Sequence, residues 1–335
     1  TFEWPFLLER TRHLGLRLYV DRTLSEPHTS TYGHVSITGR ANIDFGDFAD
    51  EISEVKVKTL ENIAIYMGIL EAKFEPIEVV DYPAYWDDKG KRRQLIEYSM
   101  RRAKIILGVA EEMLNFALEL SGISGLPLDQ VGSAAVGFRT ESYIIRQAFR
   151  YGELIPKRVE RPYFPYQGAV VLKPKPGLHE DVAVLDFKSM YPNIMISYNI
   201  SPDTYIDPKE TLPQKNINVT PDVGHRFLKS PPGLYNRILT QLIEVREKIR
   251  SELGDLKPGN VKYRLLDARQ RAVKVMTNAA YGYAGWVGAR WYMRPVAEAT
   301  AAWGRYIIGK TIAIAEEIGL DVIYGDTDSI FIKYD

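Results

Sequence analysis

Two runs of strand-forming residues flank a turn that carries two aspartates, Asp326 and Asp328, in "VIYGDTDSIFI" near the end of the chain. Strands disfavour Asp, and side chains two apart in extended backbone lie on one face. Two carboxylates on one face repel each other unless a cation or a proton lies between them. A polar β-turn, in which Asp is favoured, is the alternative interpretation. The apolar flanks favour a divalent ion, because unpaired charge is costly to bury.

A third candidate ligand is Asp186, which ends the apolar strand pattern of "VAVLDFKSMYPN" just before a helix expected to begin near Ser189. A carboxylate beside a helix N-terminus suits a metal ion together with phosphate groups. An ordinary helix cap is the alternative. As a metal ligand, Asp186 would complete a set of three hard oxygen ligands with Asp326 and Asp328, and such ligands select Mg²⁺ or Mn²⁺.

A polar stripe runs along the helix predicted for "DARQRAVKVMTNAAYGYAGW". Its members at helical spacing are Gln270, Lys274, Asn278 and Tyr281. Residues at such spacing share one face, and Lys274 with Arg246 or Arg271 would neutralise a triphosphate. A solvated polar face is the alternative for the stripe alone. Together with the acidic residues, it indicates two-metal phosphoryl or nucleotidyl transfer.

These residues need particular elements to bring them together. Apolar spacing predicts helices over about 234–253, 261–281 and 297–318, and the breaker "GDLKPGN" between the first two suits an antiparallel helix pair. Residues 106–150 are predicted to be mostly helical, and residues 1–105 to mix short strands and helices. A connector rich in Pro, Arg and Lys, "GELIPKRVERPYFPYQGA", indicates a domain boundary.

Composition limits the classes of protein. The chain has 335 residues, 45% hydrophobic and 26% charged, with zero formal net charge and no cysteine, which excludes disulfides and thiolate zinc sites. No apolar run is long enough for a membrane span, so we expect an intracellular, cytoplasmic protein. Basic residues do gather locally, with nine Lys or Arg against five Asp or Glu between Leu242 and Lys274. Both ends fall within predicted elements, so we expect a fragment.

The motifs, in this order and spacing, resemble family B DNA polymerases, most closely the archaeal members. "DFKSMYPNI" is similar to the first palm motif, "KVMTNAAYG" to the fingers motif and "YGDTDS" to the second palm motif, while "YQGA" and "TAAWGR" are similar to a linker motif and a further palm segment. The resemblance implies an α/β (α+β) fold. It comprises a ribonuclease H-like exonuclease remnant, a palm with an antiparallel sheet and a two-helix fingers module. The implied parts are a partial 3′→5′ exonuclease-like domain (1–113), a helical connector (114–155), a first palm part (156–235), fingers (236–286) and a second, truncated palm part (287–335), with the thumb absent.

The resemblance also implies DNA-directed DNA polymerase activity with two Mg²⁺ ions, Mn²⁺ being possible. Asp186 and Asp328 match the principal metal ligands, with Asp326 as a neighbouring carboxylate and the Phe187 carbonyl as a further ligand. Lys274 and Arg246 match triphosphate contacts. Tyr191 matches an aromatic residue that excludes a ribose 2′-hydroxyl, which disfavours an RNA polymerase. The nucleotide-binding positions implied are Phe187, Ser189, Met190, Tyr191, Arg246, Gln270, Lys274, Asn278 and Tyr281.

The sequence departs from the family pattern at several positions. Ala279 and Asn193 each stand where Ser is common, and we expect these changes to tune activity only. In the exonuclease-like part Tyr98 is kept, but Glu3 and Arg102 occupy positions of metal-binding Asp residues. A cation in a cation-binding site is worse than a missing ligand, so we expect proofreading to be lost or badly weakened.

Primer–template DNA and dNTPs are the partners that the resemblance implies. It also implies a sliding clamp, contacted through a C-terminal region outside these residues. The location that it implies is nucleoid-associated, with no membrane partner. Without a thumb to grip the duplex, we expect the 335 residues alone to be weakly active or inactive. The alternative is a catalytically silent DNA-binding or scaffolding subunit on the polymerase fold. The presence of Asp186, Asp326 and Asp328 disfavours it.

Overall fold

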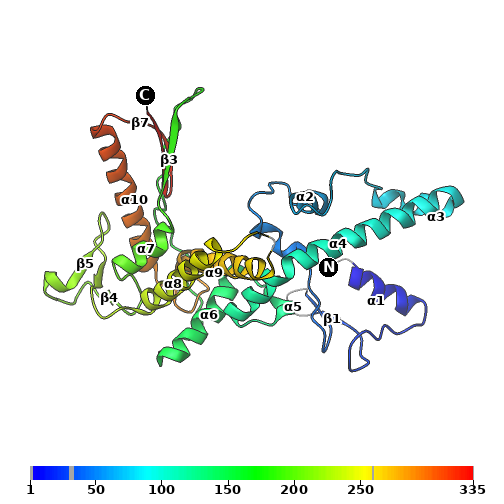
Figure 1. Cartoon of the computed structure of the whole chain (residues 1–335). Coiled ribbons are helices and arrows are strands. Elements are labelled where there is room, and N and C mark those ends of the chain that lie inside the picture. The colour runs from blue at the N-terminus through cyan, green and yellow to red at the C-terminus, as the bar shows by residue number, and fades with distance from the viewer. Residues whose placement is uncertain (1–2, 30–33, 259, 335) are drawn as a thin grey trace. The chain divides into compact units, whose positions relative to one another are not determined.

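The computed structural model describes residues 3–29, 34–258 and 260–334 (Figure 1). The chain divides into two compact units. The first comprises residues 1–135 and 256–272, and the second comprises residues 136–255 and 273–335. Helix α9 (Val261–Gly285) crosses the boundary between residues 272 and 273, so its first half belongs to one unit and its second half to the other.

The first unit is mainly helical. Its elements are α1 (Glu3–His13), β1 (His28–Thr29), β2 (Val35–Ser36), η1 (Phe45–Glu51), α2 (Leu60–Tyr66), η2 (Val79–Asp81), α3 (Tyr82–Asp87), α4 (Lys89–Ser124) and α5 (Leu128–Val131). In the described part of this unit, the two-residue strands β1 and β2 form the only sheet. Short strands thus occur together with helices among the described residues of this unit, as predicted for residues 1–105.

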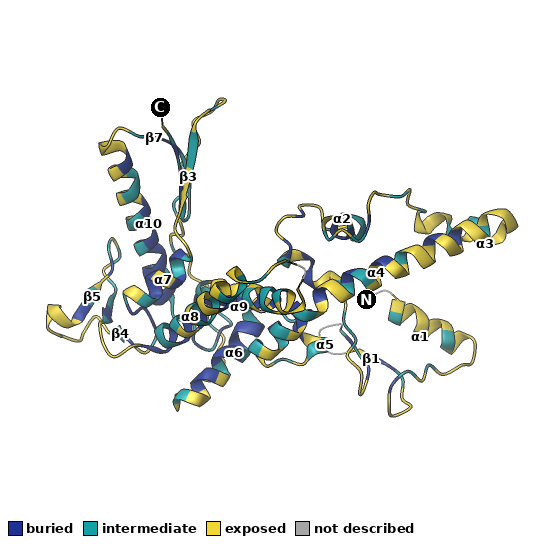
Figure 2. Ribbon diagram, viewed as in Figure 1, coloured by how far each residue is buried: buried dark blue, intermediate teal, exposed yellow. Residues whose placement is uncertain are grey.

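Helix α4 organises the core of the first unit. It begins at an N-cap, Asp88, whose carboxylate accepts hydrogen bonds from the backbone amides of Gly90 and Lys91. It ends at Gly125, whose φ of 78° is a left-handed conformation that glycine adopts without strain. Figure 2 shows buried residues recurring along it. These are Leu95, Tyr98, Ile105, Val109, Met113, Phe116, Ala117, Leu120 and Ser124, mostly at the spacing of one helix face.

The second unit contains the expected antiparallel sheet and the long helices. Its helices are α6 (Val136–Tyr151), α7 (Met190–Ser197), η3 (Gln214–Asn216), α8 (Leu234–Gly254), the second half of α9 and α10 (Arg294–Glu317). Its strands are β3 (Val182–Asp186), β4 (Tyr205–Ile206), β5 (Ile217–Val219), β6 (Arg226–Leu228), β7 (Asp321–Asp326) and β8 (Ser329–Lys333). The predictions for helices near 234–253, 261–281 and 297–318 agree with α8, α9 and α10 to within a few residues.

The main sheet of this unit has the strand order β3-β8-β7, and both pairings are antiparallel. In β8 the buried Ile330 and Ile332 alternate with less buried neighbours, as expected of a strand with one face on a core. Helix α10 contacts β7, β8 and α7, so it supplies that core with a run of small buried residues. A second antiparallel sheet has the order β4-β6-β5.

The N-terminus of α8 is capped by a loop from residues 199–204. The Asp203 carboxylate accepts from the backbone amide of Leu234 at 3.0 and 3.1 Å, and the Asn199 side-chain oxygen accepts from Gly233 at 2.9 Å. A Cβ on Gly233 would lie 2.7 Å from both Ser201 and Thr204, so this close approach requires glycine. The loop thereby satisfies amides that have no partner within the helix and fixes where α8 begins.

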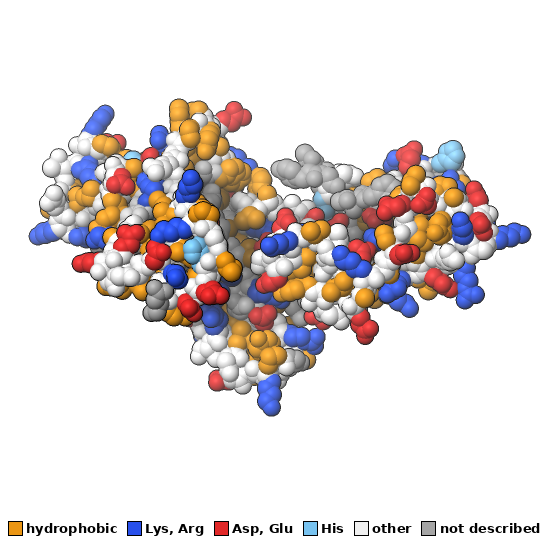
Figure 3. Space-filling view, turned by 90° about the horizontal axis from the view of Figure 1, so that it is seen from above, with side chains coloured by type: hydrophobic (Ala, Val, Ile, Leu, Met, Phe, Trp, Pro, Cys, Tyr) orange, Lys and Arg blue, Asp and Glu red, His pale blue; other side chains and the backbone are white. Residues whose placement is uncertain are grey.

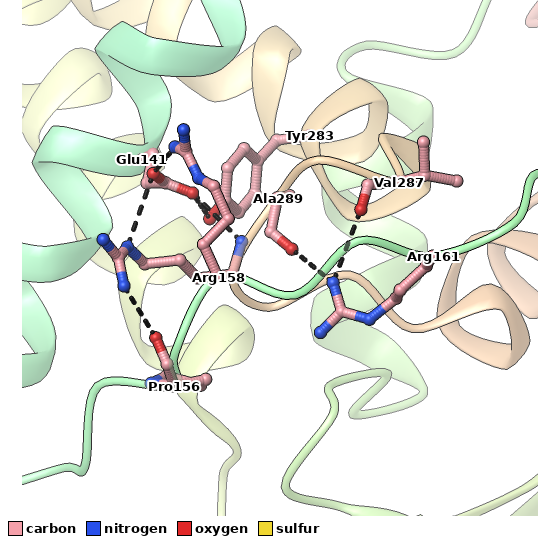
Figure 4. A network of polar contacts seen from close by, with 8 residues as sticks. Glu141, Pro156, Arg158, Arg161, Tyr283, Val287 and Ala289 are labelled. Carbon is pink, nitrogen blue, oxygen red and sulfur yellow. Dashed lines mark hydrogen bonds and ion pairs between the residues drawn. The ribbon is translucent and has the colours of Figure 1, made fainter.

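A buried carboxylate, Glu141 on α6, ties together three parts of the second unit (Figure 4). It accepts hydrogen bonds from the Arg158 guanidinium, from the Tyr283 hydroxyl at 3.1 Å and from the backbone amide of Arg290 at 3.0 Å. The Arg290 side chain donates to the Pro156 carbonyl at 2.9 Å. The Glu141 carboxylate thus links the connector, the end of α9 and the loop after it through its ion pair with Arg158 and two further hydrogen bonds.

Among the described residues, no helix combines the length and the apolar composition that crossing a bilayer requires.

Candidate active site

The ends of three neighbouring strands bring the acidic residues of the two palm-like motifs together. In the register of the main sheet, Asp186 at the end of β3 pairs with Ser329 at the start of β8, and Asp326 at the end of β7 pairs with the same serine from the other side. Asp328 precedes Ser329 directly. The backbone amide of Phe187 donates to the Asp328 carbonyl at 2.8 Å, which fixes the end of β3 to the β7–β8 turn.

The β7–β8 connection is a tight turn rather than extended backbone. Asp326 is the last residue of β7, and Thr327 adopts a φ of 51° in the left-handed region. The turn expected to carry Asp326 and Asp328 is therefore present, and the two side chains do not share a strand face, because the strand ends between them. The turn is held by the amide of Asp328, which donates to the Asp326 carbonyl at 2.6 Å, and by the amide of Thr327, which donates to the Val170 carbonyl at 3.0 Å.

The segment after "YQGA" supports this turn by running along β7. Its amides at Leu172 and Lys175 donate to the carbonyls of Gly325 and Ile323, at 2.8 and 2.9 Å. The segment is anchored at its start by Arg305 on α10, which is largely buried and donates to the carbonyls of Gln167 and Gly168 at 2.8 and 2.9 Å. Thus the linker-like motif and the "TAAWGR" segment position the acidic turn.

The two turn carboxylates have different surroundings. Burial raises the pKa of Asp328, and the nearby charge of Asp186 raises it further, which places these two carboxylates within electrostatic reach of each other. Asp326 instead accepts hydrogen bonds from the Thr327 hydroxyl at 2.8 Å and from the Tyr324 hydroxyl at 3.4 Å. The repulsion between Asp186 and Asp328 would be relieved by a bound cation.

A cavity of about 410 Å³ opens beside these carboxylates. Its lining combines two acids with four cationic side chains and an aromatic ring. The lining residues are Asp186, Lys188, Ser189, Met190, Tyr191, Pro192, Arg246, Arg250, Lys274, Asn278 and Asp328. A cavity with an acidic edge and an excess of positive charge suits an anionic ligand that brings cations with it. On the face in Figure 3, by contrast, acidic and basic side chains are interspersed, in keeping with the 43 residues of each sign in the chain.

The cations of the cavity come from three elements. Arg246 and Arg250 lie one turn apart on α8, Lys274 lies on α9, and Lys188 follows β3. Burial, followed by repulsion from Arg250, lowers the pKa of Arg246. Lys188 pairs with Glu247 at 2.7 Å. An anion in the cavity would relieve the repulsion between the two arginines.

The predicted polar stripe of α9 meets the cavity only in part. Lys274 and Asn278 line it, whereas Gln270 and Tyr281 of the same stripe do not. Two predicted residues from other elements, Phe187 and Asp326, are also described by the structure and do not line the cavity. Gln270 donates to Asp267 at 3.0 Å on its own helix. Arg271, which we considered as a second phosphate contact, also pairs with Asp267, at 3.2 Å. The stripe is continuous along the helix, but its first turn belongs to the other unit.

The start of α7 forms another wall of the cavity. Ser189, with a φ of 50°, precedes the helix, and Met190 and Tyr191 are its first two residues. The Tyr191 ring lies against the Tyr281 ring, with centroids 4.2 Å apart, and the Tyr281 hydroxyl is 3.4 Å from that of Tyr166. Asn193, one of the departures from the family pattern, donates to the Lys188 carbonyl at 2.8 Å and so steadies the loop before the helix.

Whether these residues fit a metal ion depends on how many carboxylate oxygens they offer and how these are arranged. In the parts of the chain that the structure describes, no group of three or more His, Cys, Asp or Glu side chains is arranged to hold a metal ion. The predicted set of Asp186, Asp326 and Asp328 is thus not assembled as one group. The two carboxylates that line the cavity are nevertheless hard oxygen donors whose mutual repulsion favours a divalent cation.

Some residues of the cavity escaped the sequence analysis. Arg250 was missed although it stands four residues after Arg246, a spacing that places both on one helix face. Lys188 and Pro192 also line the cavity, and both lie within the motif that contains Asp186. The anchoring role of Arg305 had no local signal, because its partners are 137 and 138 residues away in the sequence.

The exonuclease-like positions lie in the first unit. Arg102 donates to Glu61 at 3.1 Å and to the Tyr98 hydroxyl at 3.3 Å, so its charge is already paired. The Tyr98 ring packs edge-on against Phe74 and Tyr82, with centroids 5.6 and 6.5 Å apart. Glu3 is an exposed residue at the start of α1.

Comparisons with known proteins agree on one family. The model of "DNA polymerase family B" matches residues 126–335. "DNA polymerase 2" of Aeropyrum pernix is 52% identical over 335 residues, which are all of this chain and 42% of that protein. A "DNA polymerase" of Archaeoglobus fulgidus is 43% identical over 331 residues, 99% of this chain and 41% of that protein. The solved family B DNA polymerase of the hyperthermophilic archaeon Pyrobaculum calidifontis matches with a TM-score of 0.87 at 50% identity, covering 100% of this chain and 44% of that one. The chain therefore spans less than half the length of these relatives.

Proposed function

Because this chain belongs to DNA polymerase family B, as its motifs predicted, we propose that its second unit carries the active site of a DNA-directed DNA polymerase. The reaction is attack by a primer 3′-hydroxyl on the α-phosphate of a dNTP, with pyrophosphate as the leaving group. The observation that carries this proposal is one cavity whose lining contains both the acids Asp186 and Asp328 and the cations Arg246, Arg250 and Lys274.

The acidic side of the cavity would hold divalent ions. Asp186 and Asp328 are the proposed ligands of two Mg²⁺ or Mn²⁺ ions, with the Phe187 carbonyl beside them and Asp326 one residue before the turn. When bound, such ions lower the pKa of an attacking hydroxyl and balance the charge of a departing phosphate. Asp326 would act mainly on the turn, because its oxygens already accept from Thr327 and Tyr324.

The basic side of the cavity would bind the triphosphate. Lys274, Arg246 and Arg250 offer charged donors at its wall, and the amides at the start of α7 add the positive end of a helix dipole. Lys274 Nζ would also give a proton to the leaving pyrophosphate oxygen. Ser189 and Met190 flank this wall.

The sugar and base of the incoming nucleotide would meet the aromatic part of the cavity. Tyr191 is proposed to lie under the sugar and to exclude a 2′-hydroxyl, which selects dNTPs over rNTPs. Asn278 would contact the nucleotide from α9, while Gln270 and Tyr281 would complete its surroundings from the same helix. Tyr281 would act largely through Tyr191, because the two rings are in contact.

The proposed domain roles follow the family. Residues 156–235 and 287–335 would form the palm, residues 236–286 the fingers, residues 114–155 a helical connector and residues 1–113 an exonuclease-like domain. Primer–template DNA and dNTPs are the proposed partners, and a sliding clamp and nucleoid association are further family expectations.

Template-directed primer extension tests this function. The assay uses an enzyme of the relatives' full length that contains this sequence, a primer–template of mixed sequence and one dNTP at a time. We expect extension only by the dNTP complementary to the template. If the protein is instead a catalytically silent DNA-binding subunit, it should bind the same duplex in a gel-shift assay and should not extend the primer with any dNTP.

Proofreading is proposed to be lost or badly weakened. What supports this is the Arg102 guanidinium, which stands at a metal-ligand position of the motif and is paired with Glu61. Incubation of a labelled single-stranded 3′ end with the full-length enzyme and Mg²⁺ should leave the end intact. Digestion that Glu3→Ala abolishes would show that another carboxylate has replaced the missing ligand.

A further inference from the structure

A glycine on α10 packs directly against the ring of Tyr191. A Cβ built on Gly304 would lie 3.0 Å from Tyr191 Cε1, 3.8 Å from Tyr191 Cδ1 and 3.5 Å from the Met190 methyl carbon. Glycine is a poor residue for the interior of a helix, so its presence here calls for a reason. Gly309, on the same helix, offers a contrast, because nothing lies within 4 Å of its Cβ position.

The Tyr191 ring has little freedom to retreat from an added methyl group. One neighbour is Gly304, and another is the Tyr281 ring at 4.2 Å. Burial raises the pKa of the Tyr191 hydroxyl, as expected of a ring enclosed by packed groups. The open space next to the ring is the cavity that Tyr191 lines together with Asp328 and Asn278.

The position of helix α10 relative to Tyr191 is also fixed by its other contacts. The next residue, Arg305, is largely buried and donates to two backbone carbonyls of the linker segment, at 2.8 and 2.9 Å. Ala301 and Ala302, earlier on the same helix, are both fully buried. Interiors packed this closely transmit a displacement rather than absorb it.

We propose that Gly304 is a positioning residue for sugar recognition: its missing Cβ lets the Tyr191 ring sit back from the cavity and leaves room for a deoxyribose. This inference rests on the proposed polymerase function, in which Tyr191 contacts the sugar. It assigns specificity to a residue that itself touches no nucleotide.

Gly304→Ala should therefore push the ring toward the incoming sugar. We expect KM for a correct dNTP to rise about two- to tenfold, the change that corresponds to one side chain forced off its preferred rotamer. The value of kcat should change by less than about twofold, because the carboxylates and cations of the cavity are untouched.

A double-variant series separates this effect from general damage to the helix. Single-nucleotide incorporation is measured in the full-length enzyme for Gly304→Ala alone, with Tyr191→Phe and with Tyr191→Ala. The rise in KM should persist beside Phe, which keeps the ring, and vanish beside Ala, which removes it. Gly309→Ala is the matched control, and its KM should equal that of the unchanged enzyme.

Other results of these measurements would overturn either the inference about Gly304 or the proposals on which it rests. An unchanged KM in Gly304→Ala, or an equal rise in the Tyr191→Ala background, would overturn the inference. If Gly304→Ala does not fold, the double variant with Tyr191→Ala should recover the fold, and failure to recover would also overturn it. An unchanged enzyme that extends no primer refutes the proposed function instead. Ribonucleotide use that Tyr191→Ala leaves unaltered refutes the assignment of Tyr191 to the sugar, on which this inference rests.

Discussion

Phe187 and Asp328 are joined by a backbone hydrogen bond of 2.8 Å, which fixes the end of β3 to the β7–β8 turn across 141 positions of sequence. The bond makes the spacing of Asp186 and Asp328 a property of the sheet rather than of flexible side chains. A site that must hold ions in a defined geometry requires such rigid support. The same sheet edge also receives the linker segment, through the Val170 carbonyl.

Lys274→Ala should weaken nucleotide binding and slow incorporation. Removal of a charged donor from the cavity wall is expected to lower kcat/KM by about 30-fold or more, since the triphosphate would lose one of its cations. Steady-state incorporation over a range of dNTP concentrations measures this. Arg271→Ala, three residues earlier on α9, is the matched control, because Arg271 pairs with Asp267 and does not line the cavity. Equal losses in the two variants would contradict the assignment of Lys274.

Glu141→Ala should destabilise the second unit. The substitution leaves the paired arginines Arg158 and Arg290 without their carboxylate and the Tyr283 hydroxyl without its acceptor. Loss of one partner from such a buried network costs about 3 kcal/mol. Urea unfolding followed by circular dichroism measures the change. Glu141→Gln, which still accepts hydrogen bonds, should cost less, and Glu160→Ala at an exposed connector position should change stability by less than about 0.5 kcal/mol.

Asp21 should make the stability of the first unit depend on pH. The Ser25 hydroxyl, helped by the Thr23 hydroxyl and the backbone amides of Ser25 and Thr23, holds the pKa of Asp21 at about 2, below the ordinary aspartate value of 3.8. A folded-state pKa that is lowered contributes stability above the unfolded value, and this contribution is lost as pH falls toward 2. Asp21→Asn should therefore be less stable than the unchanged chain at pH 7 and indistinguishable from it near pH 2. A difference in unfolding midpoint that stays constant over this range would contradict the role of the charge.

Much of the candidate site could be predicted because motif spacing marks positions on regular elements. Asp186 at a strand end and Lys274 with Asn278 on one helix face follow from periods of two and 3.6 residues, and all three line the cavity. The same reasoning could not foresee the left-handed conformation of Thr327, which ends β7 and separates Asp326 from Asp328. Turn geometry depends on a backbone bond to Val170, far away in the sequence.

The long helices and the antiparallel sheet could also be predicted, and the family resemblance is confirmed. Tertiary partners could not. Nothing in the local sequence shows that Glu141 is buried beneath Arg158 and Arg290, or that the glycine at position 304 makes room for a ring 113 positions earlier.

The central claim is that Asp186 and Asp328 form the ion-dependent edge of a nucleotidyl-transfer site, and one pair of variants tests it most directly. The rate of single-nucleotide incorporation with Mg²⁺ is measured for Asp328→Asn and, as a control, for Asp321→Asn, which lies at the other end of β7 and pairs with Lys175. We predict a loss of at least about 100-fold for Asp328→Asn, and no more than about a twofold change for Asp321→Asn. Incorporation by a folded Asp328→Asn enzyme at the unchanged rate would contradict the claim.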